Sequence, residues 1–140
     1  MHVEKEFDVT LATAVAYRRV AADETLIDLF PEAKTEIVES DGDERTVRSH
    51  YTALGQAGVA TFRFRFVPET EVRFEKVCDG RVWSKLEGKV RFRERGGKTR
   101  VCIQMDGRTR ALVPEFTIKG AMKDQLEQMA RALRERLRDD

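Results

Sequence analysis

The sequence predicts an α+β domain in which a long antiparallel sheet curves around one C-terminal helix. Between Lys34 and Arg110 the chain reads as six consecutive strands, and every connection is short enough for antiparallel neighbours. After Pro114 the pattern changes to one long amphipathic helix. Because an apolar helix stripe and an apolar sheet face must cover each other, we expect an apolar space between them.

The N-terminal part predicts one strand and two short helices. Residues 1–9 alternate charged and apolar side chains, which indicates a strand at a sheet edge or beside the last strand. Thr10 is a suitable helix cap, and residues 11–20 predict the first helix. Residues 23–30 predict a second helix, which ends before Pro31 because proline cannot continue a helix.

The sheet prediction rests on alternation interrupted by turn residues. The six strands are residues 34–40, 45–54, 59–67, 71–78, 81–94 and 98–110. Tracts rich in glycine, proline or aspartate separate them, as tight turns require, at residues 41–43, 55–58, 68–70, 79–80 and 96–97. Asp79-Gly80 is a two-residue hairpin signal, since glycine tolerates positive φ.

Alternation also predicts which side chains face the core. Phe62, Phe64 and Phe66 alternate with arginines and so share one face. In strand 81–94 the predicted apolar face consists of Val82, Ser84, Leu86, Gly88, Val90 and Phe92. Trp83 then falls on the opposite, charged face. Gly88 in the middle of the apolar face predicts a bulge or a sharp bend.

The last helix is predicted to begin near Pro114, a good first-turn residue. Its apolar side chains recur at spacings of three, four and six and form one stripe, made of Phe116, Met122, Leu126, Met129, Leu133 and Leu137. The other side carries charges of both signs, which is typical of a helix face in water.

Composition fits one domain over residues 1–140, large enough for a core without disulfides or metal. The 26 basic and 25 acidic side chains give a formal charge of +1, which excludes a polycation or an acidic tail. Residues 1–50 hold 6 basic and 12 acidic side chains, whereas residues 81–114 hold 10 and 3. The two regions are therefore expected to carry opposite electrostatic potential.

The chain shows no sign of export or of a metal site. Residues 1–9 lack the apolar run of a signal peptide, and no window approaches the roughly 18 apolar residues of a membrane span, so we expect a cytoplasmic protein. Cys78 and Cys102 fall on next-nearest strands, roughly 10 Å apart, which disfavours a disulfide. With only His2 and His50 as histidines, neither a zinc site nor a cofactor is predicted.

The order of strand, two short helices, six-strand meander and long helix resembles the START-like superfamily, also called the helix-grip, polyketide cyclase-like or SRPBCC group. The resemblance covers essentially the whole chain. Residues 9–20 look like the entry from the family's first strand into its first helix, and residues 97–101 look like its penultimate turn and last strand. Family members include lipid carriers, coenzyme Q-binding proteins, aromatase/cyclases, hormone receptors and co-chaperones. The resemblance therefore implies a helix-grip fold with a cavity, and no single reaction.

We therefore predict an apolar pocket between sheet and helix that binds a hydrophobic small molecule or lipid. Phenylalanine and the flexible, polarisable methionine suit such a site. The predicted ligand-binding residues are Tyr51, Phe62, Phe64, Phe66, Phe74, Ser84, Leu86, Ile103, Met105, Phe116, Met122 and Met129. A solid core built from the same residues is the alternative interpretation.

Few polar groups are expected on the inner face, and they suit the orientation of a ligand. They are Ser49, Tyr51, Ser84 and, near a turn, Thr61. Acid/base catalysis would need a titratable pair inside the pocket, and the sequence places none there. His50 falls on the outer face by alternation, and no base can be assigned to Ser84, so no catalytic residue is predicted.

Two other functions compete with a carrier, sensor or accessory role. One is a cyclase or dehydratase-type enzyme that folds a reactive ligand into shape, with Tyr51 or Ser84 polarising a carbonyl. The other is an interaction module, since basic residues cluster near Trp83 on the outer face. They are Arg63, Arg65, Lys85, Lys89, Arg91, Arg93 and Arg100. Nucleic acid, a protein or an acidic membrane could bind there, the last two with Trp83 as anchor, although glutamates on neighbouring strands would neutralise much of the positive charge and make the face an ordinary solvated one.

Overall fold

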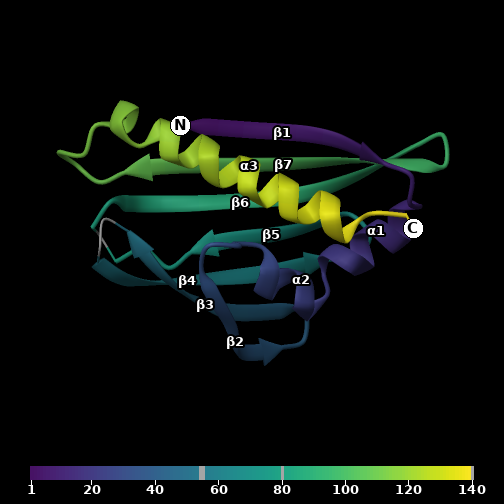
Figure 1. Ribbon diagram of the computed structural model, residues 1–140, viewed down its shortest axis with the longest axis horizontal. Helices are drawn as coiled ribbons and strands as arrows, with labels where there is room; N and C mark the ends of the chain where they lie inside the picture. The colour runs from purple at the N-terminus through teal and green to yellow at the C-terminus, as the bar shows by residue number, and fades with distance from the viewer. Residues whose placement is uncertain (54–55, 80, 140) are drawn as a thin grey trace.

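The computed structural model describes residues 1–53, 56–79 and 81–139, and its main feature is one curved antiparallel sheet (Figure 1). The elements are, in chain order, β1 (His2–Val9), α1 (Thr13–Val20), α2 (Asp23–Asp28), β2 (Lys34–Asp41), β3 (Glu44–Ala53), β4 (Gln56–Val67), β5 (Glu71–Lys76), β6 (Trp83–Arg95), β7 (Lys98–Thr109), the 3-10 turn η1 (Glu115–Thr117) and α3 (Lys119–Arg136). The α+β class, the seven-stranded sheet and the long C-terminal helix agree with the prediction.

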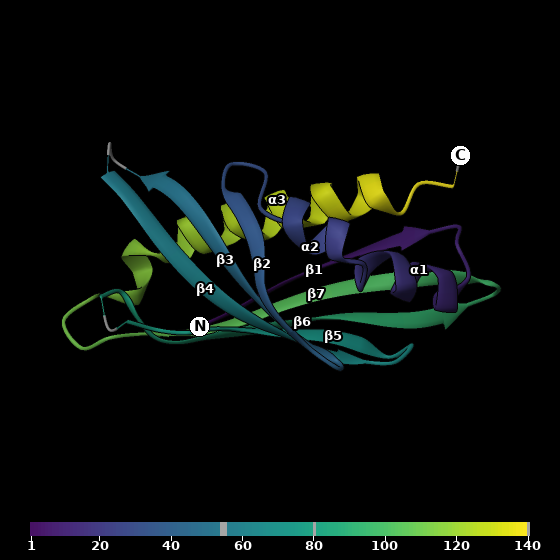
Figure 2. The same cartoon turned by 90° about the horizontal axis from the view of Figure 1, so that it is seen from below.

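The sheet is a meander closed by the first strand. Its order is β1-β7-β6-β5-β4-β3-β2, and every pair is antiparallel. The first strand therefore pairs with the last, as one of the two sequence alternatives proposed. Figure 2 shows β2–β4 crossing the direction of β6 and β7, so that the sheet curves around α3. Helices α1 and α2 lie beside the C-terminal end of α3 (Figure 1).

Element ends differ from the prediction by a few residues. The strand predicted at 59–67 begins at Gln56, because residues of the expected turn still pair with β3, as in the Tyr51–Gly58 pair. The strand predicted at 71–78 ends at Lys76, and the last helix follows a 3-10 turn. The predictions for Leu54, Gly55 and Gly80 lie outside the described residues.

The core lies between the inner sheet face and the three helices. Its most enclosed side chains include Phe64, Ile103 and Val101 from the sheet, and Met129 and Leu133 from α3. The α3 stripe is buried as predicted from Met122 to Leu137. Phe116 is the exception, because it lies in η1 before the helix and is 81% exposed.

Gly88 makes room for an aromatic ring, and of the two predicted features, a bulge or a sharp bend, the bulge is absent. It pairs in unbroken register with Phe74 and Met105. A Cβ atom at this position would stand 2.4 Å from Phe74 Cζ and 2.5 Å from the backbone oxygen of Gln104. The ring therefore lies across the backbone of β6, and only glycine leaves it that space.

Two further observations concern membrane-spanning helices and the cysteines. Among residues 1–53, 56–79 and 81–139, no helix combines the length and hydropathy needed to cross a bilayer. Cys78 and Cys102 are both free thiols.

We expect Gly88→Ala to lower the free energy of unfolding by about 1–3 kcal/mol, because the new methyl overpacks a site bounded by backbone. Gly120→Ala is the matched control, since nothing lies within 4 Å of its Cβ position on α3. That change should stabilise the helix by about 1 kcal/mol or less. Urea unfolding of both variants measures the difference, and equal effects would contradict this account of Gly88.

We expect Glu71→Gln to destabilise the protein at neutral pH but not in acid. Glu71 is 8% exposed, and a hydrogen bond from Arg73 Nε (2.8 Å) lowers the pKa of its carboxyl. The stabilisation that Glu71 gains from Arg73 is therefore complete above the pKa of a glutamate in the unfolded chain, about 4.3. It is lost as the pH falls through the lower pKa that Glu71 has in the folded protein. Melting curves from pH 7 to pH 2 should converge for parent and variant. A difference in melting temperature that did not change with pH would refute this explanation. Glu75→Gln is the control, because Glu75 is exposed and its replacement should have little effect at any pH.

Candidate ligand pocket

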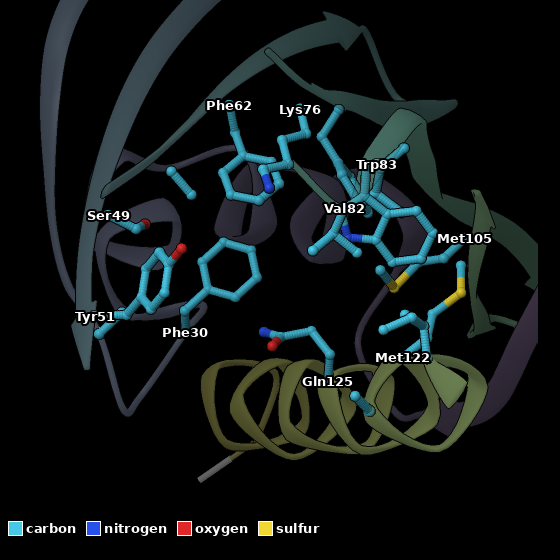
Figure 3. A pocket seen from close by; sticks show the side chains of 16 residues that line it. Phe30, Ser49, Tyr51, Phe62, Lys76, Val82, Trp83, Met105, Met122 and Gln125 are labelled. Carbon is cyan, nitrogen blue, oxygen red and sulfur yellow. The ribbon is translucent and has the colours of Figure 1, made fainter. Parts of the chain in front are cut away.

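A pocket of about 430 Å³ opens between the inner sheet face and the N-terminal part of α3. Figure 3 shows side chains from the sheet, from the segment after α2 and from α3 turned toward this one space. The lining residues are Phe30, Ala33, Ser49, Tyr51, Ala60, Phe62, Phe74, Lys76, Val82, Trp83, Leu86, Met105, Ile118, Ala121, Met122 and Gln125. Most are apolar, so the space suits an apolar occupant.

The structure brings six of the twelve sequence-predicted residues to this pocket. They are Tyr51, Phe62, Phe74, Leu86, Met105 and Met122. Phe62 also stacks on Phe30, with ring centroids 5.3 Å apart, which fixes one wall.

Four predicted residues belong to the solid core instead. Phe64, Phe66, Ile103 and Met129 are buried and do not line the pocket. Phe64 packs against Phe74, with centroids 5.7 Å apart, and the Arg45 guanidinium covers the Phe66 ring. The solid-core interpretation therefore holds for the C-terminal half of β4, for Ile103 on β7 and for the middle of α3.

The prediction for Trp83 and Ser84 is wrong because a β-bulge reverses their faces. Trp83 pairs with Thr109 and Lys85 pairs with Arg108, which leaves Ser84 as the extra residue. Beyond the bulge Trp83 lies on the inner face and lines the pocket. Ser84 is exposed, and its hydroxyl donates to the Arg108 carbonyl at 3.0 Å.

Two more predicted residues lie outside the pocket. Phe116 is exposed on η1, next to the pocket residue Ile118 but turned toward solvent. Thr61 lies between Ala60 and Phe62, whose side chains line the pocket, so alternation turns it to the outer face.

Three aromatic rings lie close against the sheet, each beside a glycine of a neighbouring strand. A Cβ atom on any of these glycines would stand 2.4–2.5 Å from the nearest ring atom. The pairs are Tyr51 over Gly58, Phe74 over Gly88 and Trp83 over Gly107. Because the rings occupy the space of the missing side chains, they project less into the pocket and leave its volume open.

Two polar residues of the pocket were missed from the sequence, although alternation could have found both. Lys76 follows Phe74 by two positions on β5 and so shares its inner face. Gln125 follows Met122 by three positions on α3 and so lies on the same helix face. Figure 3 shows both side chains reaching toward the space between Tyr51 and Trp83.

The polar groups near the pocket differ in how they are engaged. The lining residues include no Asp, Glu or His within the described parts of the chain. Ser49 is buried, and its hydroxyl shares a 2.7 Å hydrogen bond with that of Thr35. His50 lies outside, with Nε2 3.2 Å from Glu36 Oε1, as alternation predicted. In the described ranges no three His, Cys, Asp or Glu side chains are placed to hold a metal ion.

The outer sheet face has its own hollow, of about 660 Å³, lined by charges of both signs. Four basic side chains of this face line it, Arg63, Arg65, Arg73 and Lys89, whereas Arg45 at its border turns its guanidinium to Phe66 and Asp23. Five acidic ones also line it, Glu39, Glu44, Glu75, Glu87 and Asp106. The hollow therefore carries no excess of positive charge, and Trp83 lines the pocket on the other face of the sheet.

Exposed apolar side chains gather at the end of the sheet where Tyr51, Val82 and Ile118 line the pocket. Of the eight large apolar side chains that are exposed in the described residues, six lie on strand ends or loops at this end. They are Tyr51, Val59, Val77, Val82, Leu112 and Phe116. We call them the apolar rim.

No family model matches the chain, and a comparison with curated proteins finds no match either. Solved structures do match over nearly the whole chain. A Thermus thermophilus protein, TTHA0849, is 20% identical with a TM-score of 0.79, over 98% of this chain and 97% of its own. The Zhui aromatase/cyclase of a Streptomyces species is 20% identical with a TM-score of 0.74, over 99% and 96%.

A START superfamily protein from Mycobacterium smegmatis is 21% identical with a TM-score of 0.76, over 97% of this chain and 96% of that one. At such identities the likeness concerns the fold. Together with the curved seven-stranded sheet around α3, it shows that this chain has the START-like, helix-grip fold.

Proposed function

We propose that this protein binds a hydrophobic small molecule or lipid in the pocket under α3 and acts as a carrier, sensor or accessory factor. The pocket itself is the observation that carries the proposal. Its volume of about 430 Å³ falls within the range of about 300–1,000 Å³ of small-molecule sites.

The chemistry of the walls supports an apolar ligand. Aromatic rings of Phe30, Phe62 and Trp83 and the thioethers of Met105 and Met122 surround the space. Each Å² of apolar ligand surface removed from water contributes about 25 cal/mol to binding. The apolar rim lies at the same end of the sheet and offers an apolar ligand a path of entry.

The fold is compatible with this role. Two of the similar structures carry the names START superfamily protein and aromatase/cyclase. Both names belong to those proteins, and the present proposal rests on the pocket of this chain.

Native mass spectrometry of the purified protein, with solvent extraction of any bound molecule, is the direct experiment. We expect a stoichiometric apolar adduct. A protein without an adduct, whose melting temperature also stays unchanged with lipids, quinones and aromatic polyketides, would overturn the proposal.

We expect Ala121→Phe to fill the pocket and weaken ligand binding at least tenfold while the fold stays intact. Ala121 lines the pocket but is exposed and is not packed in the core. A larger side chain there should therefore occupy the space of the ligand without disturbing the core. Trp83 is the only tryptophan and lies in the pocket wall, so its fluorescence reports occupancy.

Ala57→Phe is the matched control, because Ala57 is exposed on β4 and does not line the pocket. It should bind as the parent does. If the two variants titrated identically with an apolar probe, the ligand would bind elsewhere.

A cyclase-type activity is the second candidate, favoured by the Tyr51 hydroxyl in the apolar wall. Such a group can polarise a carbonyl while the pocket holds a reactive chain folded. Ser84 has no such role, since it lies outside. We expect Tyr51→Phe to lower the cyclisation rate of a poly-β-ketone mimic with unchanged affinity. A parent rate equal to that in buffer would exclude this candidate.

A further inference from the structure

We infer that the ligand is an apolar molecule bearing an oxyanion, and that Lys76 binds the oxyanion inside the pocket. The inference rests on the proposed function and specifies its ligand class. It concerns Lys76, the one charged residue among the described residues that line the space.

Lys76 is placed as a cation without a counterion. It is the last residue of β5, is half-buried, and reaches into the pocket beside Phe62 (Figure 3). Among residues 1–53, 56–79 and 81–139, no carboxylate lies within ion-pair distance of Nζ, and no acceptor bonds to it. A bound anion would supply the charged partner that the described residues do not give this side chain.

The acidic residue that follows β5 is already engaged elsewhere. The Asp79 carboxylate accepts a hydrogen bond from the backbone N–H of Arg81 at 3.0 Å and pairs with Arg81 Nε at 3.4 Å. Lys76 acts on Asp79 only through a longer-range electrostatic interaction. The ammonium therefore remains available to a ligand.

The remaining polar groups of the pocket reinforce the preference for an acceptor. Trp83 Nε1, the Tyr51 hydroxyl and the Gln125 amide have no hydrogen-bond partner in the described part of the chain. No buried side-chain N or O atom in the described residues lacks a partner, so the unpaired nitrogens of Trp83 and Gln125 still reach solvent, and Tyr51 is itself exposed. The nitrogens of the lysine and tryptophan side chains can only donate hydrogen bonds. The tyrosine hydroxyl and the glutamine amide can either donate or accept them. The free groups thus form a donor-rich set in an apolar wall.

Two fluorescent probes that differ by one oxyanion test the inference. The anionic probe is 8-anilinonaphthalene-1-sulfonate, and the neutral probe is N-phenyl-1-naphthylamine, which lacks the sulfonate. We expect Lys76→Gln to weaken the anionic probe about tenfold or more, in line with a charged hydrogen bond. The neutral probe should change less than about twofold, and Lys76→Arg should retain most of the anion affinity.

Lys123→Gln is the matched control, because it removes the same charge from the exposed face of α3. It should leave both probes unchanged. If it weakened the anionic probe as much as Lys76→Gln does, net charge would explain the effect and the inference would fall.

The outcomes separate the inference from the function on which it rests. If neither probe bound the parent protein, the proposed function and the inference would both be refuted. If both probes bound and Lys76→Gln affected them equally, the pocket would stand and the oxyanion would be refuted. Displacement of the anionic probe by decanoate identifies a free carboxylic acid, and displacement by decyl phosphate identifies a phosphate headgroup. Displacement by neither would refute the inference.

Discussion

Packing of α3 against the concave face of the sheet covers the apolar surfaces of both elements, which would otherwise face water. The contact is uneven along the helix. Met129, Leu133 and Leu137 are almost wholly buried, whereas Ala121 near the N-terminal end is exposed and Gln125 is half-buried. The buried stripe from Met122 to Leu137 holds the helix on the sheet along its length, and the pocket lies beside its first turns, at Ala121, Met122 and Gln125.

Polar contacts hold α3 in the same position. The Lys5 ammonium on β1 contacts Glu127 at 2.7 Å, and Arg136 pairs with Asp28 of α2. The Arg134 guanidinium lies over the Phe7 ring. These surface pairs add little stability each, but they join α3 to β1 and to α2 and so define where the helix stands above the sheet.

The two faces of the sheet handle charge in different ways. On the outer face basic and acidic side chains alternate between neighbours, and pairs such as Arg63 with Glu75 and Lys85 with Glu87 balance locally. On the inner face Lys76 stands without such a partner among described residues, in a wall of aromatic and methionine side chains. The excess of basic residues in the second half of the chain therefore does not produce a basic surface around the outer hollow.

Local sequence patterns determined the elements and most of their faces, because alternation and turn chemistry act over a few neighbouring residues. They gave the strand order, the buried stripe of α3 and the outward His50. Alternation also held the signal for Lys76, which lies two positions after Phe74. Tertiary structure decided the rest. The bulge at Ser84 depends on how β6 pairs with β7, and it carries Trp83 inside. Whether an inner-face residue fills the core, as Phe64 does, or lines the pocket, as Phe62 does, depends on the distance of α3 from the sheet, and no local pattern encodes that distance.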